Sequence, residues 1–345
     1  MQAFGKILAF GCVVLFIITG VMALLFFNIE QKAFSSGTYK QAFEEQNLYY
    51  RVPAILATAL STSLAENQNA QPFLKALTVQ DWQNNISSLL PPEELKAMAD
   101  HTLDSTFDYL NGETDSAVIS LLPLKAHLAG EAGLNVVRQV LRLQPECTPE
   151  QLTQMAFGLL EGQITLCNPP EAAIGFMAPF IQTQLQVMTA AFPNEIIFIP
   201  GRNSGTPDDP RLRLNTIRLV MQLSVFVPLA LLLLIVLFAV RSLSDWLQWW
   251  GWPFMITGFL SLLIALLGSP LVGWILQLLI QIQAGSLIPP ILSATIGEAA
   301  SAVTRQILTP VALEGAVLAI LGLMMVILSM FVARREKTIF ISPRQ

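Results

Sequence analysis

Residues 7–27 read ILAFGCVVLFIITGVMALLFF, which is 21 consecutive positions without a charged side chain. A helix of about 20 apolar residues is long enough to cross the hydrocarbon core of a bilayer, roughly 30 Å thick. Three more runs of this kind follow towards the C-terminus, at residues 219–240, 254–282 and 311–333. The sequence therefore predicts four transmembrane helices, with one long water-compatible region between the first helix and the second.

The composition agrees with this interpretation. Of 345 residues, 53% are hydrophobic and 12% are charged, whereas an average globular domain has about 25% charged residues. Residues 28–215 contain 11 Lys and Arg against 20 Asp and Glu, and this acidic balance argues against nucleic-acid binding. The chain contains no phosphate-binding or dinucleotide-binding glycine motif, so we expect no cofactor.

Basic residues near the ends of the apolar runs predict the orientation. Four crossings place these basic residues on one side of the membrane: Lys6, Arg241, Arg334, Arg335 and Lys337. Positive charge near the ends of spans favours the cytoplasm. We therefore expect a multi-pass cell-membrane protein with cytoplasmic termini and with residues 29–216 outside. Three arginines before the second span favour the opposite orientation, but long translocated segments escape this rule. They are Arg211, Arg213 and Arg218.

A cleaved signal peptide is the alternative for the first run. Its apolar core would be only 7 to 15 residues long and would end at a small-residue cleavage site. The 21-residue run ends in Leu24-Leu25-Phe26-Phe27, so we favour a retained signal anchor.

The predicted fold class is an all-α membrane protein with a large, mainly helical extracytoplasmic domain inserted between the first two spans. The predicted parts are a signal anchor at 1–28, the helical domain at 29–200, a linker and the start of the second span at 201–216, the second span at 217–240, a Trp-rich cytoplasmic loop at 241–252, the third span at 253–282, an outer loop with an interfacial amphipathic helix at 283–309, the fourth span at 310–333 and a basic cytoplasmic tail at 334–345.

Helix-start patterns recur through the domain. Thr78 stands three residues before Asp81, as in a capping box, and Pro-Glu pairs begin predicted helices at Pro92, Pro149 and Pro170. Gly112 is expected to end the helix that begins at Pro92. Pro53 predicts a kink or interruption in an earlier helix. The β-branched runs at residues 117–122 and 195–199 are typical of strands and predict a short two-stranded ribbon.

Two of the three cysteines, Cys147 and Cys167, lie in this domain, and Cys12 lies in the first span. In an oxidising compartment this pair would close a 21-residue loop and add about 3 kcal/mol of stability. Zinc binding by the pair is disfavoured, because no C-x-x-C pattern or nearby His accompanies it. We predict a disulfide.

The domain offers weak candidates for a metal site. Asp100, Asp104 and Asp108 repeat at every fourth position, with His101 beside the first, so one helix face carries three carboxylates. A solvated acidic face is the simpler interpretation, and a divalent-cation site is the alternative. The chain shows no catalytic motif.

Glu314 is the one carboxylate within the four apolar runs. A charge in hydrocarbon is costly, which indicates a role in transport or gating, although a position near the outer end would let it reach headgroup water. Gly268-Ser269-Pro270 predicts a break in the third span. Other polar residues of the runs include Thr19, Gln222, Ser224, Thr257, Ser261, Ser269 and Ser329.

Two groups of residues in the membrane part have structural interpretations. Small residues form a stripe on the fourth span, which predicts close packing against another span, with self-association as the alternative; they are Ala312, Gly315, Ala316, Ala319 and Gly322. Indoles gather between the second and third spans, where they are expected to anchor the chain at the lipid headgroups; they are Trp246, Trp249, Trp250 and Trp252.

These patterns give three functional hypotheses. The first is a non-enzymatic membrane protein whose outer domain binds a protein, peptide or envelope ligand, with the lipid bilayer and a protein as its partners, acting as a scaffold or accessory subunit. The second is a transporter or channel component that uses Glu314 and the break at Pro270. The third is an extracytoplasmic enzyme built on the acidic helix face around Asp104.

Overall fold

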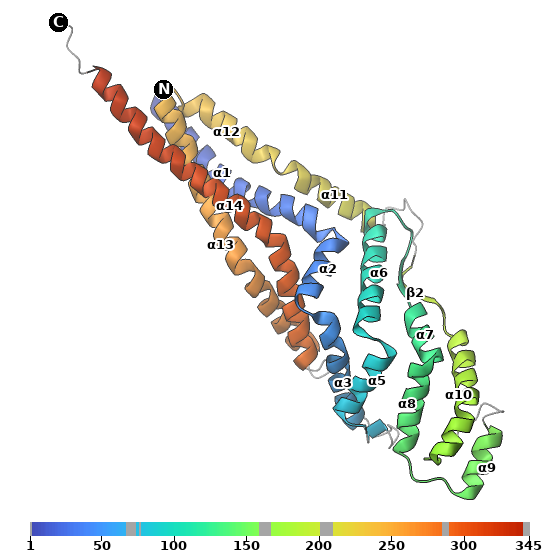
Figure 1. The fold of residues 1–345 in the computed structure, drawn as a ribbon. Coiled ribbons are helices and arrows are strands. Elements are labelled where there is room, and N and C mark those ends of the chain that lie inside the picture. The colour runs from blue at the N-terminus through green and yellow to red at the C-terminus, as the bar shows by residue number, and fades with distance from the viewer. Residues whose placement is uncertain are drawn as a thin grey trace. The chain divides into compact units, whose positions relative to one another are not determined.

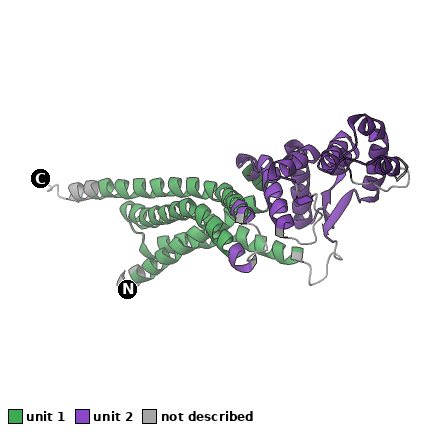
Figure 2. Cartoon of the chain, turned by 90° about the horizontal axis from the view of Figure 1, so that it is seen from below, with its two compact units in different colours: residues 1–42, 205–279, 296–345 green, residues 43–204, 280–295 purple. Residues whose placement is uncertain are grey.

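The computed structural model describes residues 2–66, 74–75, 77–158, 167–200, 210–284 and 290–340. The chain forms two compact units, shown in green and purple in Figure 2. Unit 1 comprises residues 1–42, 205–279 and 296–345, and unit 2 comprises residues 43–204 and 280–295.

Unit 1 contains four helical segments that are long and apolar enough to cross a membrane. The chain is therefore a multi-pass membrane protein, as predicted. Its helices are α1 Gln2–Ala33, α11 Pro210–Leu223, α12 Phe226–Ala239, and most of α13 Leu243–Ala284 and α14 Pro290–Phe340 (Figure 1). Helix α1 packs along both α11 and α12.

The second span consists of two helices and not of one. A turn at Ser224 and Val225 separates α11 from α12. The Ser224 hydroxyl donates to the carbonyl of Met221 at 2.6 Å, and Pro228 has no N–H to bond to the carbonyl four residues earlier. The helical ladder is therefore interrupted here, while α11 already begins at Pro210, inside the predicted linker.

The last two helices are longer than predicted. Helix α13 begins at Leu243 and includes all four tryptophans, so the predicted loop at 241–252 is mostly helix. It also continues unbroken through Pro253 and Pro270, so the predicted break at Gly268-Ser269-Pro270 is wrong. A proline removes only one ladder hydrogen bond, and packing against α14 on both sides of this position keeps the helix together.

Helix α14 also corrects the prediction for residues 283–309. From Pro290 onwards these residues belong to the same helix as the fourth span, which passes through Pro310 without interruption. The amphipathic segment is therefore the first part of α14 and not a separate interfacial helix. The helix also extends through the basic residues to Phe340, and residues 341–345 of the predicted tail lie outside the described residues.

Glycines allow α13 and α14 to touch backbone to backbone. Gly273 and Gly297 face each other: a Cβ built on Gly273 would lie 2.7 Å from the carbonyl oxygen of Gly297. Gly258 faces Gly315 and Ala319, and Gly251 faces Gly322, in the same way. We call these contacts the glycine seam. Gly315, Ala319 and Gly322 of the small-residue stripe therefore lie against α13 in this structure, which is how small residues let membrane helices approach closely.

Unit 2 is mainly helical, with helix starts where the sequence predicts them. Its helices are α3 Leu48–Glu66, α5 Val79–Leu89, α6 Pro92–Asn111, α7 Leu122–Ala129, α8 Glu131–Arg142, α9 Pro149–Gly158 and α10 Glu171–Ala191, preceded by α2 Ser36–Glu45, which begins in unit 1. Thr78 and Asp81 form the predicted capping box of α5. Gly112 ends α6 with φ 80°, a conformation that glycine adopts without strain. Pro53 lies inside α3, and the interruption expected there comes earlier, where Asn47 has φ 50° between α2 and α3.

The predicted ribbon is confirmed. Strand β1 Ala117–Ser120 pairs antiparallel with β2 Glu195–Ile199, with an irregularity between Ala117 and Val118. Strand β1 packs on α6, and Ala117 is fully buried. Strand β2 has no such cover, since four of its five residues are exposed.

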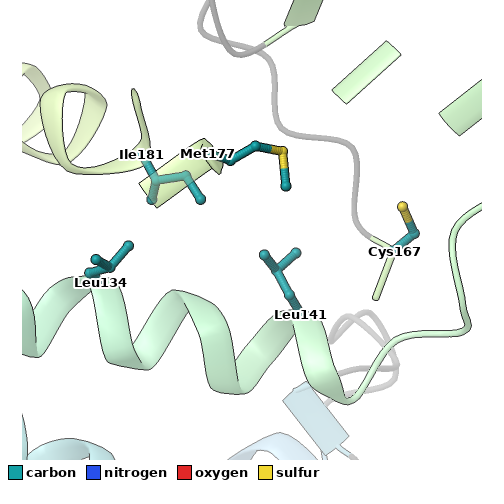
Figure 3. Packing of buried hydrophobic residues seen from close by; sticks show 5 residues of the cluster. All are labelled: Leu134, Leu141, Cys167, Met177 and Ile181. Atoms are coloured by element: carbon teal, nitrogen blue, oxygen red, sulfur yellow. The ribbon is translucent and has the colours of Figure 1, made fainter. Parts of the chain in front are cut away.

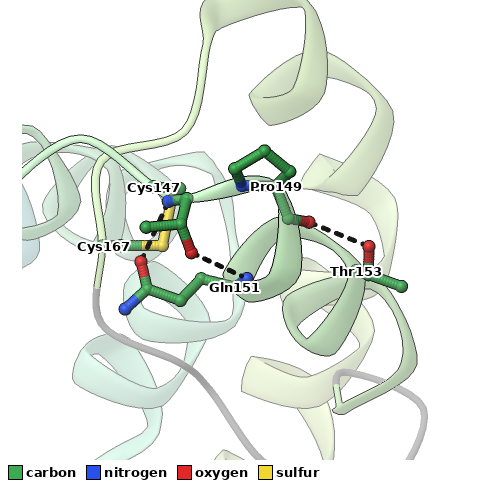
Figure 4. The surroundings of a disulfide bond; sticks show 6 residues. Cys147, Pro149, Gln151, Thr153 and Cys167 are labelled. Carbon is green, nitrogen blue, oxygen red and sulfur yellow. Dashed lines mark hydrogen bonds between the residues drawn. A yellow bond between two sulfur atoms is a disulfide. The ribbon is translucent and has the colours of Figure 1, made fainter.

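Helices α7, α8 and α10 pack together in unit 2 (Figure 1). Their core lies between α8 and α10 and contains Leu134, Leu141, Met177 and Ile181, with Cys167 at one end (Figure 3). Cys167 is bonded to Cys147, so the predicted disulfide is present (Figure 4). It closes the loop that carries α9.

Local hydrogen bonds support this closed loop. Thr148 and Gln151 bond reciprocally at the start of α9. The backbone N–H of Gln151 donates to the Thr148 hydroxyl at 3.3 Å, and the backbone N–H of Thr148 donates to the side-chain oxygen Oε1 of Gln151 at 3.0 Å. This is a capping box with glutamine in place of glutamate. The Thr153 hydroxyl also donates to the carbonyl of Pro149 (Figure 4).

The close contacts of the glycine seam predict that one added methyl group lowers the stability of the protein. Gly258→Ala places a Cβ against the backbone of Gly315 and Ala319, so the two helices must separate, and we expect a loss of about 1–3 kcal/mol of stability. Gly11→Ala in α1 is the matched control, because its Cβ would meet nothing within 4 Å. Thermal unfolding in detergent, followed by tryptophan fluorescence, checks this. Equal midpoints for the two variants would contradict the seam.

Candidate functional site

Two buried polar residues of unit 1 lie near the C-terminal end of α1. Asn28 is 2% exposed and Glu30 is 8% exposed. Two residues apart on a helix, they point to different sides of α1, and each meets a different helix. The end of α1 is therefore held by polar contacts on two faces.

On the first face, Asn28 contacts α14. Its side-chain Nδ2 donates to Glu314 Oε2 at 2.8 Å and to the carbonyl of Leu24 at 2.9 Å. Both amide hydrogens of Asn28 are thereby used. In the part of the chain that the structure describes, this is the one hydrogen bond of the Glu314 carboxylate, whose other oxygen, Oε1, accepts none.

On the second face, Glu30 binds α11. Its Oε1 accepts hydrogen bonds from Arg218, at 3.3 Å from Nε and 3.2 Å from the terminal nitrogen, and from Gln222 Nε2 at 3.0 Å. The Arg218 guanidinium also lies 5.0 Å from the ring centre of Phe34, within reach of a cation–π interaction. Arg218 and Gln222 are four residues apart, so one face of α11 supplies both donors.

A cavity of about 360 Å³ lies beside the Asn28–Glu314 pair. Its walls come from α1, α12, α13 and α14 and are apolar except for two side chains, Glu314 and Thr257. The Thr257 hydroxyl is fully buried and has no hydrogen-bond partner among the described residues. Leaving such a group unpaired costs about 1–3 kcal/mol, so this wall of the cavity can still gain a hydrogen bond.

This arrangement can bind a ligand but offers few groups that could catalyse a reaction. A carboxylate and a hydroxyl on an apolar wall can hold a donor group in place. Within the described ranges, no three His, Cys, Asp or Glu side chains come together where they could hold a metal ion. The site as described suits recognition of a ligand.

The structure places the acidic residues of α6 apart from this site, in unit 2. Asp100 accepts a hydrogen bond from the Tyr49 hydroxyl at 3.3 Å. Burial and the Asp100 carboxylate raise the pKa of Tyr49 above its usual value. Asp100 thus stabilises the packing of α3 on α6. His101, Asp104 and Asp108 lie along the same helix and belong to no group of metal-binding geometry in the described part of the chain.

The four tryptophans take different environments on α13. Trp249 and Trp250 pack against a cluster that contains Cys12, Phe16 and Ile235. The ring centres of Trp246 and Trp250 lie 5.1 Å apart, with the rings tilted by 47° to each other, whereas Trp252 is 47% exposed.

Unit 2 has an apolar surface of its own on α10 and β2. On α10, Phe176, Phe180 and Val187 lie on one face of the helix and are exposed, Phe176 at 73%. The rings of Phe176 and Phe180 are 6.1 Å apart and cover each other only partly. On β2, Ile196 and Phe198 point to one side of the ribbon and Ile197 to the other, and all three are at least 40% exposed. Both sides of β2 are therefore uncovered in the described structure.

Sequence reasoning singled out Glu314, gave Thr257 only as one of several polar residues in the spans, and missed Asn28 and Glu30. Asn28 and Glu30 follow the apolar run directly, so they looked like the beginning of the water-soluble region. The available signal was helical spacing: Leu24, Asn28 and Lys32 continue one face of the first helix, and Arg218 with Gln222 forms a donor pair at i and i+4.

Comparisons of the chain with models of protein families, with curated proteins and with solved structures gave no match. The function therefore has to be argued from the chemistry of these sites.

The energetic coupling between Glu30 and Arg218 can be measured with a double-mutant cycle. Arg218→Met leaves a mostly buried carboxylate with only Gln222 as partner, and we expect a loss of about 2–3 kcal/mol, moderated because the Arg218 side chain is 25% exposed. Adding Glu30→Leu removes the uncompensated charge and should restore much of this loss. Thermal unfolding in detergent measures both. Arg241→Met, at an exposed position outside the cluster, is the control and should be near neutral, and additive effects of the two substitutions would contradict the coupling.

Proposed function

We propose that the chain is a non-enzymatic membrane recognition protein: unit 2 faces the extracytoplasmic side and binds a protein partner, and the helices of unit 1 anchor it in the bilayer. Both termini are then cytoplasmic. The Cys147–Cys167 disulfide supports this orientation, because disulfides persist in oxidising compartments and are rare in the cytosol.

The observation that carries the binding role is the uncovered strand β2. Native proteins normally protect edge strands with charges, prolines or a covering element. Strand β2 reads Glu-Ile-Ile-Phe-Ile, exposes apolar side chains on both sides and, in the described part of the chain, pairs only with β1. Such an edge is suited to β-strand addition by an extended segment of a partner.

The charge of the domain indicates the chemistry of that partner. Residues 43–204 contain 17 Asp and Glu but only 7 Lys and Arg. An acidic surface attracts positively charged partners and repels anionic lipid headgroups. We therefore propose a partner with an apolar, extended segment flanked by basic residues. The exposed face of α10 adds aromatic contact area, and aromatic residues are typical of interface centres.

A transport role has less support. The cavity beside Glu314 is apolar apart from two side chains, and α13 continues unbroken through Pro270. Ion pathways in membrane proteins are normally lined by polar or ionisable residues. An enzymatic role also has less support, because the acidic face of α6 does not form a recognisable set of catalytic groups.

The proposed orientation can be tested through the cysteines. Cells are quenched in acid, and thiols are labelled with a mass-tagged maleimide under denaturing conditions. We expect one labelled thiol, that of Cys12, and three after reduction, because Cys147 and Cys167 are paired. Cys147→Ser is the control and should show two labelled thiols without reduction. Three free thiols in the unreduced wild type would contradict the orientation.

The binding role can be tested on β2 itself. A photo-crosslinking residue at Ile197 is expected to trap a specific protein in native membranes, and Ile197→Asp should weaken binding of that purified protein by about tenfold or more, because it places a charge at an apolar contact. Leu122 on α7 is the matched control: it is 52% exposed but lies outside α10 and β2. Circular dichroism checks that both variants are folded. Equal crosslinking at the two positions, or unchanged binding of Ile197→Asp, would reject this surface.

A further inference from the structure

The cavity in unit 1 has the size and lining of a small-molecule site. Its volume of about 360 Å³ falls in the range of known ligand pockets, roughly 300–1,000 Å³. Its walls include Phe16, Phe27, Leu229 and Phe254 from three different helices, and Leu229 on the rim is 52% exposed. These helices are long and apolar enough to cross a membrane, so a ligand dissolved in the bilayer can reach an opening between them.

The two polar groups of the cavity each have unused hydrogen-bonding capacity among the described residues. Glu314 Oε1 accepts no hydrogen bond from any described residue, and the carboxylate forms no ion pair there. The Thr257 hydroxyl is 0% exposed and unpaired. Glu314 and Thr257 come from neighbouring helices and line the same cavity.

The carboxyl group of Glu314 limits which ligand groups can pair with it. An ionised carboxylate only accepts hydrogen bonds, and in an apolar setting it requires a cation or several donors. Asn28 supplies a single N–H, and the Arg218 guanidinium is bound to Glu30 instead. The missing component is a positive group with several donors, and a primary ammonium has three.

We propose that this cavity binds a single-chain amphiphile with a primary amine head group: the ammonium pairs with Glu314 Oε1 and Thr257, and the alkyl chain fills the apolar walls. A phospholipid with an ethanolamine head carries the same amine. Its phosphate, however, would bring a negative charge next to Glu314. The site therefore prefers the single-chain amine. This proposal is independent of the recognition role of unit 2.

The test uses the full-length protein in phosphatidylcholine nanodiscs and a long-chain alkylamine that carries a photoreactive diazirine. We expect crosslinks on residues of the cavity wall, such as Phe27 and Leu229, and labelling that saturates. The matching alkyl alcohol should label these residues at least about tenfold less than the amine, because it lacks the charge-assisted hydrogen bonds. Equal labelling by amine and alcohol overturns the proposal.

Three variants separate a specific site from general partitioning. Glu314→Gln keeps an acceptor for Asn28 but removes the charge, and it should lower amine labelling by about tenfold or more. Thr257→Val, which preserves the shape of the side chain, should lower it several-fold. Ser261→Ala is the control, because its hydroxyl is equally buried and unpaired but does not line the cavity. Unchanged labelling in Glu314→Gln or Thr257→Val, or a loss as large in Ser261→Ala, overturns the site.

The source of the amine is tested by competition. Unlabelled dodecylamine should suppress labelling, whereas phosphatidylethanolamine added to the nanodiscs should leave it nearly unchanged. If phosphatidylethanolamine competes as well as dodecylamine, the preference for a single-chain ligand is overturned.

Discussion

The close contact between α13 and α14 determines how the rest of unit 1 is arranged. Membrane helices gain little from burying apolar side chains against each other, because lipid is equally apolar, so close backbone packing has to hold them together. Gly258 meets Gly315, and Gly273 meets Gly297, without intervening side chains. Thr257 and Glu314 are the immediate neighbours of Gly258 and Gly315. The glycine seam therefore also sets the positions of the two polar groups that line the cavity.

Helix α1 completes this arrangement through polar contacts. Asn28 binds Glu314 on one side, and Glu30 binds Arg218 and Gln222 on the other. In a low-dielectric environment such contacts are directional and strongly disfavour a helix that slides or rotates. With α1 held, the space between it, α12 and the seam remains open as a cavity instead of closing by repacking. The proposed amine site is thus a consequence of how the helices are locked.

Unit 2 is stabilised by other means. Water surrounds such a domain, so hydrophobic burial between α8 and α10, helix capping and the Cys147–Cys167 bond stabilise it. The same helix α10 that forms the core on one face exposes Phe176 and Phe180 on the other. Together with the uncovered strand β2, this surface gives the domain its proposed role, while the membrane helices give it a location.

The sequence by itself determined the features that depend on neighbouring residues. Apolar runs predicted four spans, capping and proline patterns predicted the starts of α5, α6, α9 and α10, and β-branched runs predicted the ribbon. These features are local, since a helix or strand responds to its own dihedral preferences and to the solvent around it. The predicted break at Pro270 failed because packing against α14 outweighs the loss of one hydrogen bond. Only the tertiary structure decided that Asn28, 286 positions away in the chain, would bind Glu314, and that Thr257 would share a cavity with it. Such pairings depend on how helices are rotated and spaced against each other. The spacing of residues within one helix shows which of them share a face, but not which helix that face meets.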